Sequence, residues 1–375
     1  MNLETIKAHF SIIRDERQSA KVDYPLFDLL FGSICAIIAG GQGWTDIREY
    51  VLGHHEWFLK QGLFEKGVPV DDTFARLISN IDPTEFRECF LAWMKAVHTL
   101  TCGEIVAIDG KTLRGSYNRE DRQSAIHMVS AYASANQLVL GQLKTDTKSN
   151  EITAIPALIQ MLDLRGAIVT IDAMACQTKI AKAITHKGGD YLLAVKGNQG
   201  KLAAALQAAF APHRRAPIDT SACQIEKQKS RVEARTYHVL SANELVGDFS
   251  SWRELTSIVM VESYRAGKGK EPELEYRYYI SSAELTPEKA GDAIRAHWGI
   301  ESMHWILDVS MREDACQIYR ENGAENLAGL RHMALNMLRA EPTKISVPMK
   351  QKRCMINPIF LEQVLLAGLT SMAKT

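Results

Sequence analysis

The chain has 375 residues, with 44 basic and 44 acidic side chains and no net formal charge. That length allows two or three structural units and a sizeable core, and apolar and charged contents of 46% and 23% are typical of a globular protein. The most apolar run, Leu26–Gly40, is interrupted by Asp28 and is too short to span a bilayer. It therefore predicts a buried helix, and we expect no membrane partner.

Composition also limits the location and the cofactors. The first ten residues lack the apolar stretch of a signal peptide. The seven cysteines are scattered and form no CxxC pair, which argues against a disulfide framework and a zinc site and favours a reducing cytoplasm. A neutral chain is not typical of nucleic-acid binding, but the segments His213–Arg235 and Lys344–Arg353 carry an excess of basic residues. Either cluster taken alone could equally be a solvated surface.

The first 100 residues predict a helical N-terminal domain. Apolar residues recur at helical spacing in 26–40, 44–62 and 83–100, and few segments there have the pattern of a strand. The Gly40–Gly41 pair predicts the end of the first of these helices.

From about residue 103 the pattern changes to an α/β arrangement. Short apolar segments predict strands at 104–109, 126–134, 137–145, 166–172 and 190–196, with amphipathic helices at 150–164 and 176–189. Three strands followed by helix-linked strands predict a mixed sheet. Strand patterns return at about 218–282, and two more helices are predicted after them, the first with Thr286 as its N-cap and Pro287 at its first position.

Two acidic residues stand at matching places in this pattern. Asp109 follows the apolar run "IVAI" and Asp172 follows "IVTI", and each is followed by a small residue. An acid at the carboxyl end of a strand in an α/β sheet is rigidly held and accessible to ligands. An aspartate after a strand is also common as a turn residue, but two in matching contexts favour a site. Paired carboxylates repel each other unless a cation lies between them, and Mg²⁺ is the natural choice.

A third carboxylate would complete a metal site for phosphodiester chemistry. The best candidate is Glu301, in a predicted helix where Trp298, Trp305 and Asp308 share its face. We expect the two tryptophans to pack in the core. Glu313 and Asp314 in the segment "MREDA" are rival third acids.

These segments resemble a known family. The motifs "AIDGKTLRGS", "NEITAIP", "TIDAMACQ", "YLLAVKGNQ", "YYISS", "HWGIESMHWILDV" and "EDACQI" occur in the order found in DDE-type insertion-sequence transposases, above all in the H-repeat-associated branch of bacterial proteins. The resemblance extends over nearly the whole chain, including "VDDTFARL" in the helical part.

The resemblance implies a ribonuclease-H-like mixed-sheet catalytic core in which the first and fourth strands lie side by side. It divides the chain into a helical domain at 1–100, a catalytic domain at 101–340 with a strand-rich insertion at about 203–282, and a C-terminal tail at 341–375. It also implies Asp109, Asp172 and Glu301 as the catalytic, metal-binding triad, with Mg²⁺ or Mn²⁺ as the cofactor.

The helix that carries the glutamate departs from the wider group of related transposases. Its positions at −7, −4 and +7 from Glu301 usually hold Tyr, Arg and Lys, whereas here they hold Ile294, His297 and Asp308. Contacts to DNA are therefore expected from other residues as well. The expected DNA-binding set is Lys111, Arg114, Lys196, Asn198, Arg295 and His297, with Arg312 as a further basic candidate.

The function expected from these observations is Mg²⁺-dependent DNA cleavage and strand transfer at the ends of an insertion sequence. The partner would be double-stranded DNA, both the terminal inverted repeats and the target, bound by a homodimer in the bacterial cytoplasm and at the nucleoid. Two alternatives remain open: a catalytically inactive, DNA-binding remnant of a transposase, and a stand-alone metal-dependent nuclease of the same fold.

Overall fold

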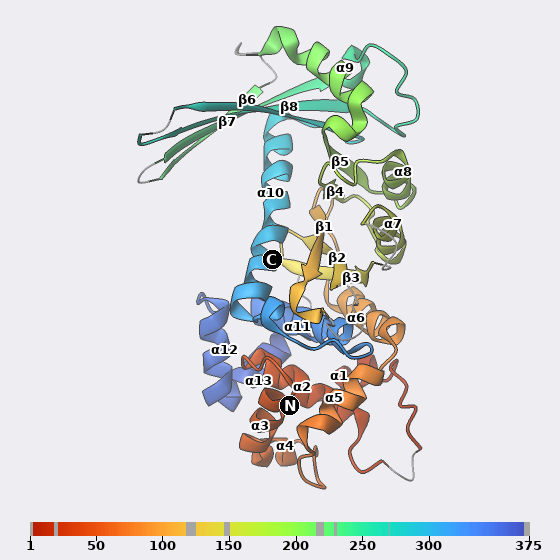
Figure 1. Ribbon diagram of the computed structural model, residues 1–375, viewed down its shortest axis with the longest axis vertical. Coiled ribbons are helices and arrows are strands. Elements are labelled where there is room, and N and C mark those ends of the chain that lie inside the picture. Colours follow the sequence, from red (N-terminus) through yellow and green to blue (C-terminus); the bar gives the residue numbers. More distant parts are fainter. Residues whose placement is uncertain are drawn as a thin grey trace.

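The computed structural model describes residues 3–18, 22–117, 125–145, 151–214, 221–228, 231–269 and 271–370. Figure 1 shows an elongated molecule: a body of helices lies at one end, a sheet flanked by helices lies above it, and a second group of strands projects from the other end. Within the described residues, no helix is both long and apolar enough to cross a membrane.

One continuous sheet contains the nine strands of the described residues. The strands are β1 Ile105–Leu113, β2 Ile126–Ala133, β3 Leu138–Lys144, β4 Ile168–Ile171, β5 Asp190–Val195, β6 Ser221–Gln228, β7 Arg231–Ser241, β8 Ser257–Gly267 and β9 Glu273–Ser281. Their spatial order is β3-β2-β1-β4-β5-β9-β8-β7-β6. β1, β4 and β5 are parallel, and the other neighbours are antiparallel.

This order confirms the predicted mixed sheet of a ribonuclease-H-like core. β1 to β3 form an antiparallel meander, and α7 (Glu151–Met161) and α8 (Thr178–His186) connect the parallel strands. Val106, Ala107 and Ile108 are fully buried because β1 is an interior strand with a neighbouring strand on each side. The first and fourth strands are adjacent, as expected.

The strand-rich segment extends the same sheet. It begins with α9 (Gly200–Phe210) and continues through β6 to β9. β9 pairs with β5, so that Leu193 is opposite Ile280, and β8, β7 and β6 follow outward. These outer strands form the projecting part of the molecule in Figure 1.

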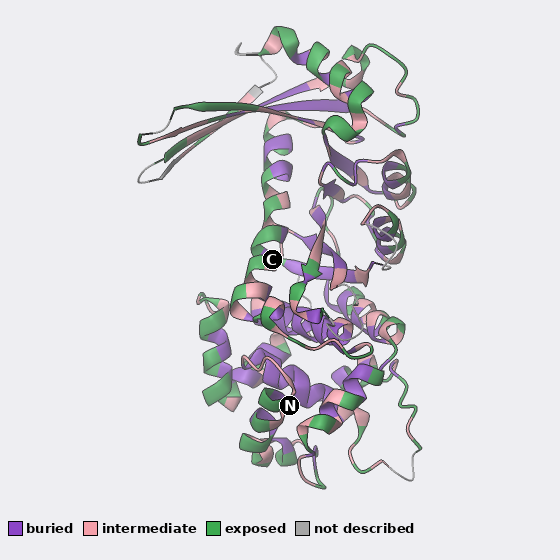
Figure 2. Ribbon diagram, viewed as in Figure 1, coloured by how far each residue is buried: buried purple, intermediate pink, exposed green. Residues whose placement is uncertain are grey.

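The helical body combines both ends of the chain. It contains α1 Glu4–Phe10, α2 Leu26–Ile38, α3 Trp44–Gly53, α4 His55–Lys60, α5 Asp71–Asn80, α6 Pro83–Val97, α11 Gly323–Ala340, α12 Val347–Ile356 and α13 Pro358–Ala367. α2 is the predicted buried helix, and it packs against α11, which is also almost entirely buried (Figure 2). The segment expected to be a C-terminal tail thus contains two helices, α12 and α13, that pack on this body.

α11 joins the helical body to the sheet. The side chain of its Asn336 accepts a hydrogen bond from the backbone N–H of Val139 on β3 and donates one to the carbonyl of the same residue, both at 2.9 Å. Without these two bonds, the buried N–H and C=O groups of Val139 would lack partners, which is energetically costly. The bonds therefore hold α11, and with it the helical body, in a fixed position against β3.

α10 (Pro287–Trp305) is the long helix that runs from the projecting strands to the helical body (Figure 1). Thr286 caps its N-terminus by accepting a hydrogen bond from the N–H of Lys289, as predicted. Its buried face is formed by small and aliphatic residues such as Ala293, Ile300 and Met303. The expectation that its tryptophans are core residues is therefore wrong: Trp298 and Trp305 are 48% and 61% exposed.

Candidate active site

The register of β1 and β4 brings two acids together. The parallel ladder runs from Ile105 opposite Ile168 to Ile108 opposite Ile171, and the next residues on the two strands are Asp109 and Asp172. Neighbouring residues in parallel register point to the same face, so the two carboxylates leave the sheet side by side.

The expectation that Asp109 ends its strand is wrong. β1 continues to Leu113, paired with β2, so only the pairing with β4 ends at Asp109. The chain needs no turn there because the antiparallel neighbour still satisfies the backbone groups of β1. Asp109 is thus held in the middle of a strand, which is more rigid than a strand end.

The loop after β4 positions the second acid. Oδ1 of Asp172 accepts the backbone N–H groups of Met174 at 3.1 Å and Ala175 at 3.3 Å. Asn198, expected at the DNA, donates its amide to the carbonyl of Ala173 at 2.6 Å. Lys196 is exposed and lines the cavity next to this loop. The segment after β5 therefore supports the loop that carries Asp172.

α10 supplies the third acid. Glu301 is exposed and lines a cavity of about 330 Å³ together with Asp172, His297 and Lys196. One turn before it, Nδ1 of His297 lies 3.0 Å from Oγ1 of Thr170 on β4. His297, another expected DNA contact, thus joins the helix to the sheet beside the acids.

Burial and neighbouring acids disfavour the charged form of Asp109. Burial, together with the nearby charges of Glu151, Asp172 and Glu301, raises the pKa of Asp109 to about 7, against a backbone hydrogen bond from Gly110. Nδ1 of His304 lies 3.8 Å from Oδ2 of Asp109, but burial lowers the pKa of this histidine to about 4. A neutral His304 does not balance the negative charge of the site at neutral pH.

The rival third acids face elsewhere. The side chain of Lys111 is 10% exposed, and its Nζ lies 2.6 Å from Asp308, 2.6 Å from Glu313 and 3.5 Å from Asp314. Arg114, whose side chain is 81% exposed, lies 3.6 Å from Asp314. Lys111 is therefore enclosed by carboxylates, and Arg114 keeps most of its guanidinium in solvent.

A fourth carboxylate lies beside the first acid, and reasoning from the sequence missed it. Glu151 begins α7, and its Oε1 lies 2.7 Å from Nε2 of His127 on β2. Nδ1 of that histidine lies 2.9 Å from Oγ1 of Thr112 on β1. A Cβ at Gly110 would come within 2.2 Å of Glu151 Oε1 and 2.4 Å of His127 Nε2. The one signal in the sequence was the glutamate of the quoted "NEITAIP" motif.

The three acids provide the type of ligand that binds a hard divalent cation. In the ranges that the structure describes, no three acidic, histidine or cysteine side chains stand close enough together to enclose a metal ion. Asp109, Asp172 and Glu301 nevertheless offer only carboxylate oxygens, the ligands of Mg²⁺ and Mn²⁺. Burial first and the charges of neighbouring acids second raise the pKa of Asp109, and a bound cation would relieve the repulsion.

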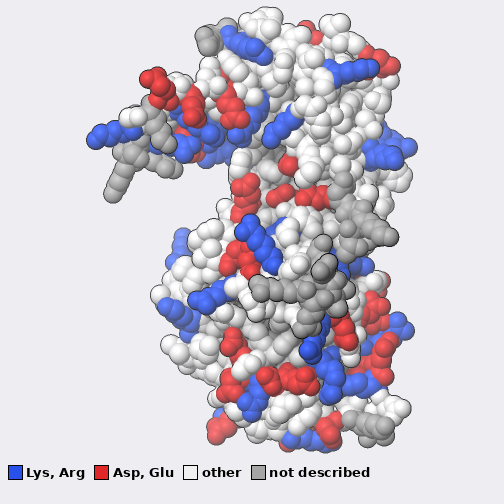
Figure 3. All heavy atoms as spheres, in the orientation of Figure 1, with Lys and Arg blue, Asp and Glu red and all other residues white. Residues whose placement is uncertain are grey.

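An arginine-lined groove adjoins the carboxylate cavity. Its volume is about 310 Å³, and it lies between α10 and the face of β6 to β9. The arginines that line it are Arg231, Arg235, Arg265, Arg277 and Arg295. Figure 3 shows basic side chains along the underside of the projecting strands and acidic ones in the hollow below them.

Carboxylates organise these arginines without neutralising them. Glu233 contacts Arg231, Arg235 and Arg265, while Glu226 contacts Arg235 and Arg295.

Arg277, the remaining arginine of the groove, lies where the groove meets the carboxylate cavity. Arg277 pairs with Glu275 at 2.9 Å, and its guanidinium lies 6.0 Å from the centre of the exposed Trp298 ring. Both residues line the groove and the cavity, so the two form a continuous surface. Five arginines against three acids leave an excess of positive charge beside the site.

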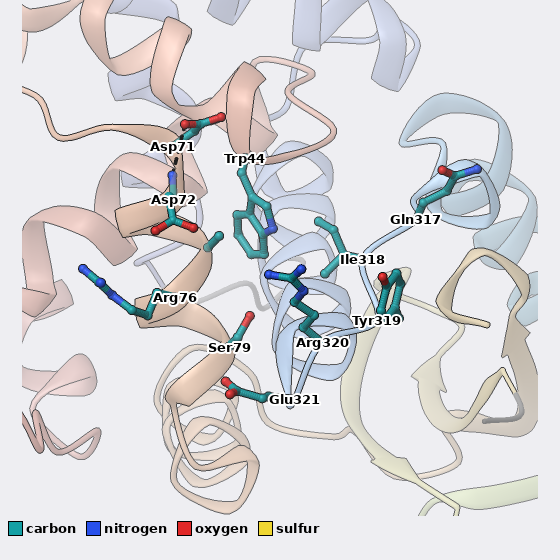
Figure 4. Close-up of a pocket in the computed structure, with 11 residues that line it drawn as sticks. Trp44, Asp71, Asp72, Arg76, Ser79, Gln317, Ile318, Tyr319, Arg320 and Glu321 are labelled. Carbon is teal, nitrogen blue, oxygen red and sulfur yellow. Dashed lines mark hydrogen bonds between the residues drawn. The ribbon is translucent and has the colours of Figure 1, made fainter. Parts of the chain in front are cut away.

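A separate cavity of about 460 Å³ lies between α5 and the segment 317–321 (Figure 4). Arg76 and Arg320 face it together with Asp72, Glu321 and the indole of Trp44. Its charges are mixed and none of the triad acids lines it, so we assign no chemistry to it.

Comparison with known proteins identifies the family of the chain. Residues 100–337 match the family described as "Transposase DDE domain", and residues 7–94 match "DDE_Tnp_1-associated". "H repeat-associated putative transposase YhhI" of Escherichia coli (strain K12) is 45% identical over 372 residues, 97% of this chain and 98% of the relative. "Putative transposase YncI" of Escherichia coli O157:H7 is 45% identical over 377 residues, 97% of this chain and 95% of the relative.

One solved structure, of the piggyBac transposase synaptic complex with hairpin DNA, aligns with 97% of this chain and 78% of its own, at 11% identity and a TM-score of 0.46. The two family matches together cover most of the 375 residues, and both of these full-length relatives are named as putative transposases. The chain belongs to the DDE transposases, with the H-repeat-associated proteins as close relatives.

Proposed function

We propose that this protein cuts and joins DNA at the ends of the insertion sequence that encodes it, with Asp109, Asp172 and Glu301 as its metal-binding acids. The observation that carries the proposal is the register that sets Asp109 beside Asp172, with a glutamate of α10 lining the same cavity. When bound, Mg²⁺ or Mn²⁺ would supply Lewis-acid activation of the attacking oxygen and neutralise charge at the phosphate.

The other residues of the site have supporting roles in this proposal. His297, bonded to Thr170, keeps α10 against β4, so that Glu301 stays at the cavity. Asn198 secures the loop of Asp172. Lys196 is exposed at the cavity of Asp172 and Glu301, and Arg114 is exposed just past the end of β1; both would contact backbone phosphates of the DNA.

The arginine-lined groove is the proposed path of the DNA away from the acids. Guanidinium groups bind phosphate oxygens through paired hydrogen bonds, and an excess of them along a strand face fits a nucleic-acid backbone. Arg295 belongs to this groove. Trp298, exposed where the groove meets the cavity, could stack on an unpaired base. Two copies of the chain would pair the two ends of the element.

The test is a cleavage and joining assay on duplexes that carry the DNA flanking the gene. Asp109→Asn should abolish Mg²⁺-dependent cleavage and leave DNA binding intact. Asp163→Asn is the matched control, since Asp163 is an exposed aspartate of the same domain, paired only with Arg165 in the salt bridges described. Cleavage retained by Asp109→Asn would overturn the assignment of the triad.

The same assay separates the two alternatives. Cleavage by the wild-type protein without sequence preference and without joining would identify a stand-alone nuclease. Binding without cleavage, at any divalent metal concentration, would identify an inactive remnant. Joining of cut ends to a second duplex supports the transposase.

A further inference from the structure

The segment that follows Asp172 is strongly basic. Residues 173–214 contain one acid, Asp190, whose carboxylate accepts a hydrogen bond from the Ser282 hydroxyl at 2.7 Å. The basic residues of the same segment are Lys179, Lys182, Lys187, Lys196, Lys201 and Arg214. The chain has no net charge as a whole, so this excess of positive charge is local to the segment that begins at the proposed active site.

Three of these lysines lie around one edge of the sheet. The side-chain amide of Gln199 donates a hydrogen bond to the carbonyl of Cys176 at 2.9 Å, so the starts of α8 and α9 are neighbours. Lys179 lies in the first turn of α8, Lys201 lies in the first turn of α9, and Lys182 follows Lys179 one turn later. All three are exposed, and none takes part in an ion pair among the described residues. We call these three residues the lysine edge.

Helix stability does not explain the lysine edge. A cation in the first turn of a helix is unfavourable because it faces the positive end of the helix dipole. Lys179 and Lys201 both have this position, and neither first turn contains an acid. Lys179 and Lys182 also repel each other, since residues three apart are neighbours on a helix surface. Charges that oppose the local structure in this way indicate an anionic partner.

The lysine edge and the arginine-lined groove lie on opposite sides of the sheet. Tyr279 of β9 lines the groove beside α10, whereas the ring of Tyr278 lies 6.1 Å from that of Phe210 on α9. Successive residues of a strand point to opposite faces, and Figure 1 shows α8 and α9 across the sheet from α10. Lys196 lines the carboxylate cavity between the two surfaces. A DNA duplex is stiff over about 150 base pairs, so one straight duplex does not follow both.

We propose that the lysine edge binds the phosphate backbone of a second DNA duplex, the one to which the cut end is joined. The inference rests on the proposed function, which brings an element end and a receiving duplex to the same acids. Lysines bind phosphates as point charges and carry no sequence information. The amide side chains of Asn198 and Gln199 are bonded to backbone carbonyls. The surface therefore fits a duplex of any sequence.

The test uses the full-length protein saturated with an unlabelled duplex that carries the element's end. Capture of a fluorescent duplex of arbitrary sequence is then followed by anisotropy at several salt concentrations. Replacement of all three lysines (Lys179→Gln, Lys182→Gln and Lys201→Gln) should lower the slope of log affinity against log salt by about two to three. Joining of a pre-cut end to the second duplex should fall in the same variant. Binding and cleavage of the element's end should stay at wild-type levels.

The matched control removes the same charge from exposed lysines of three other helices, Lys60, Lys289 and Lys352. With glutamine at these positions, the protein should capture and join the second duplex as the wild type does. An equal loss in both triple variants would assign the effect to net charge and overturn the inference. The melting temperature of the lysine-edge variant should be unchanged or higher, because the substitutions remove repulsion.

Asp109→Asn separates this inference from the proposed function. That variant should capture the second duplex normally but neither cut nor join. If the lysine-edge variant captures and joins as the wild type does, only this inference fails. If it loses cleavage of the element's end instead, the lysines hold DNA that flanks the element, and the inference is also overturned. If the wild type cleaves no end, the proposed function fails, and the capture measurement still decides whether the lysine edge binds DNA.

Discussion

Alanine in place of Gly110 would put a methyl group where two polar side chains already lie. The new Cβ would stand 2.2 Å from Glu151 Oε1, whereas ordinary contact begins at 3.4 Å, so the carboxylate must retreat by about 1 Å. His127 must move by a similar amount. Both are the far ends of side chains, so we expect the protein to fold and the acid cluster to rearrange.

The expected change in stability is small. Overpacking of this kind costs about 1–3 kcal/mol. The loss of backbone freedom in the unfolded chain returns about 0.4–1 kcal/mol, since the φ of Gly110 is compatible with alanine. The net destabilisation should therefore not exceed about 2–3 kcal/mol.

Thermal unfolding measures this destabilisation. Gly197→Ala is the control, because Gly197 lies in the loop beside the Asp172 loop and a Cβ there would have no neighbour within 4 Å. If Gly110→Ala matches Gly197→Ala in melting temperature, the explanation of Gly110 as the space for Glu151 is refuted.

Three further predictions concern charge. The folded-state pKa of Asp109, about 7, lies above its ordinary value, so its contribution to stability is complete below about pH 4 and is lost as the pH rises through 7. In the metal-free protein at pH 8, Asp109→Asn should therefore increase the free energy of unfolding by up to ~4 kcal/mol and raise the melting temperature. At pH 4 the substitution should have little effect. An equal change in melting temperature at both pH values contradicts this. Lys111→Met leaves three carboxylates without their shared cation and should destabilise the fold by about 3–5 kcal/mol, and an unchanged melting temperature would show that the network is not needed. Arg235→Ala and Arg265→Ala should each lower the slope of log affinity for DNA against log salt by about one, whereas Arg253→Ala, at an exposed site outside the groove, should not. An unchanged slope in all three variants removes the groove from the path of the DNA.

The core of the fold and the first two acids could be predicted from the sequence because their signals are local. Apolar runs and helical periodicity identify the elements of the mixed sheet. Two matching strand-plus-acid segments, at Asp109 and Asp172, need only the parallel pairing of their strands to become neighbours. The capped start of α10 is equally local, since Thr286 and Pro287 are adjacent in the chain.

What could not be predicted depends on contacts between distant segments. Glu151 and His127 meet over Gly110 for two reasons. The register of β2 on β1 sets His127 opposite Thr112, and the start of α7 brings Glu151 back over β1. The tryptophans of α10 have the composition of core residues, yet the helix turns its small and aliphatic residues inward. The last two helices of the chain, α12 and α13, carry no local sign that they pack against α11.

The arrangement of Lys111 explains why an acid is followed so closely by a cation. Asp109 and Lys111 are two places apart on β1, so their side chains leave the same face of the sheet, and the lysine would be the nearest counter-ion of the acid. Three carboxylates at and beyond the end of α10 hold its ammonium instead. The charges that set the pKa of Asp109 are then those of other acids. Because the internal cation is engaged elsewhere, the negative charge of the site can be balanced by a cation from solution, as a metal-dependent enzyme requires.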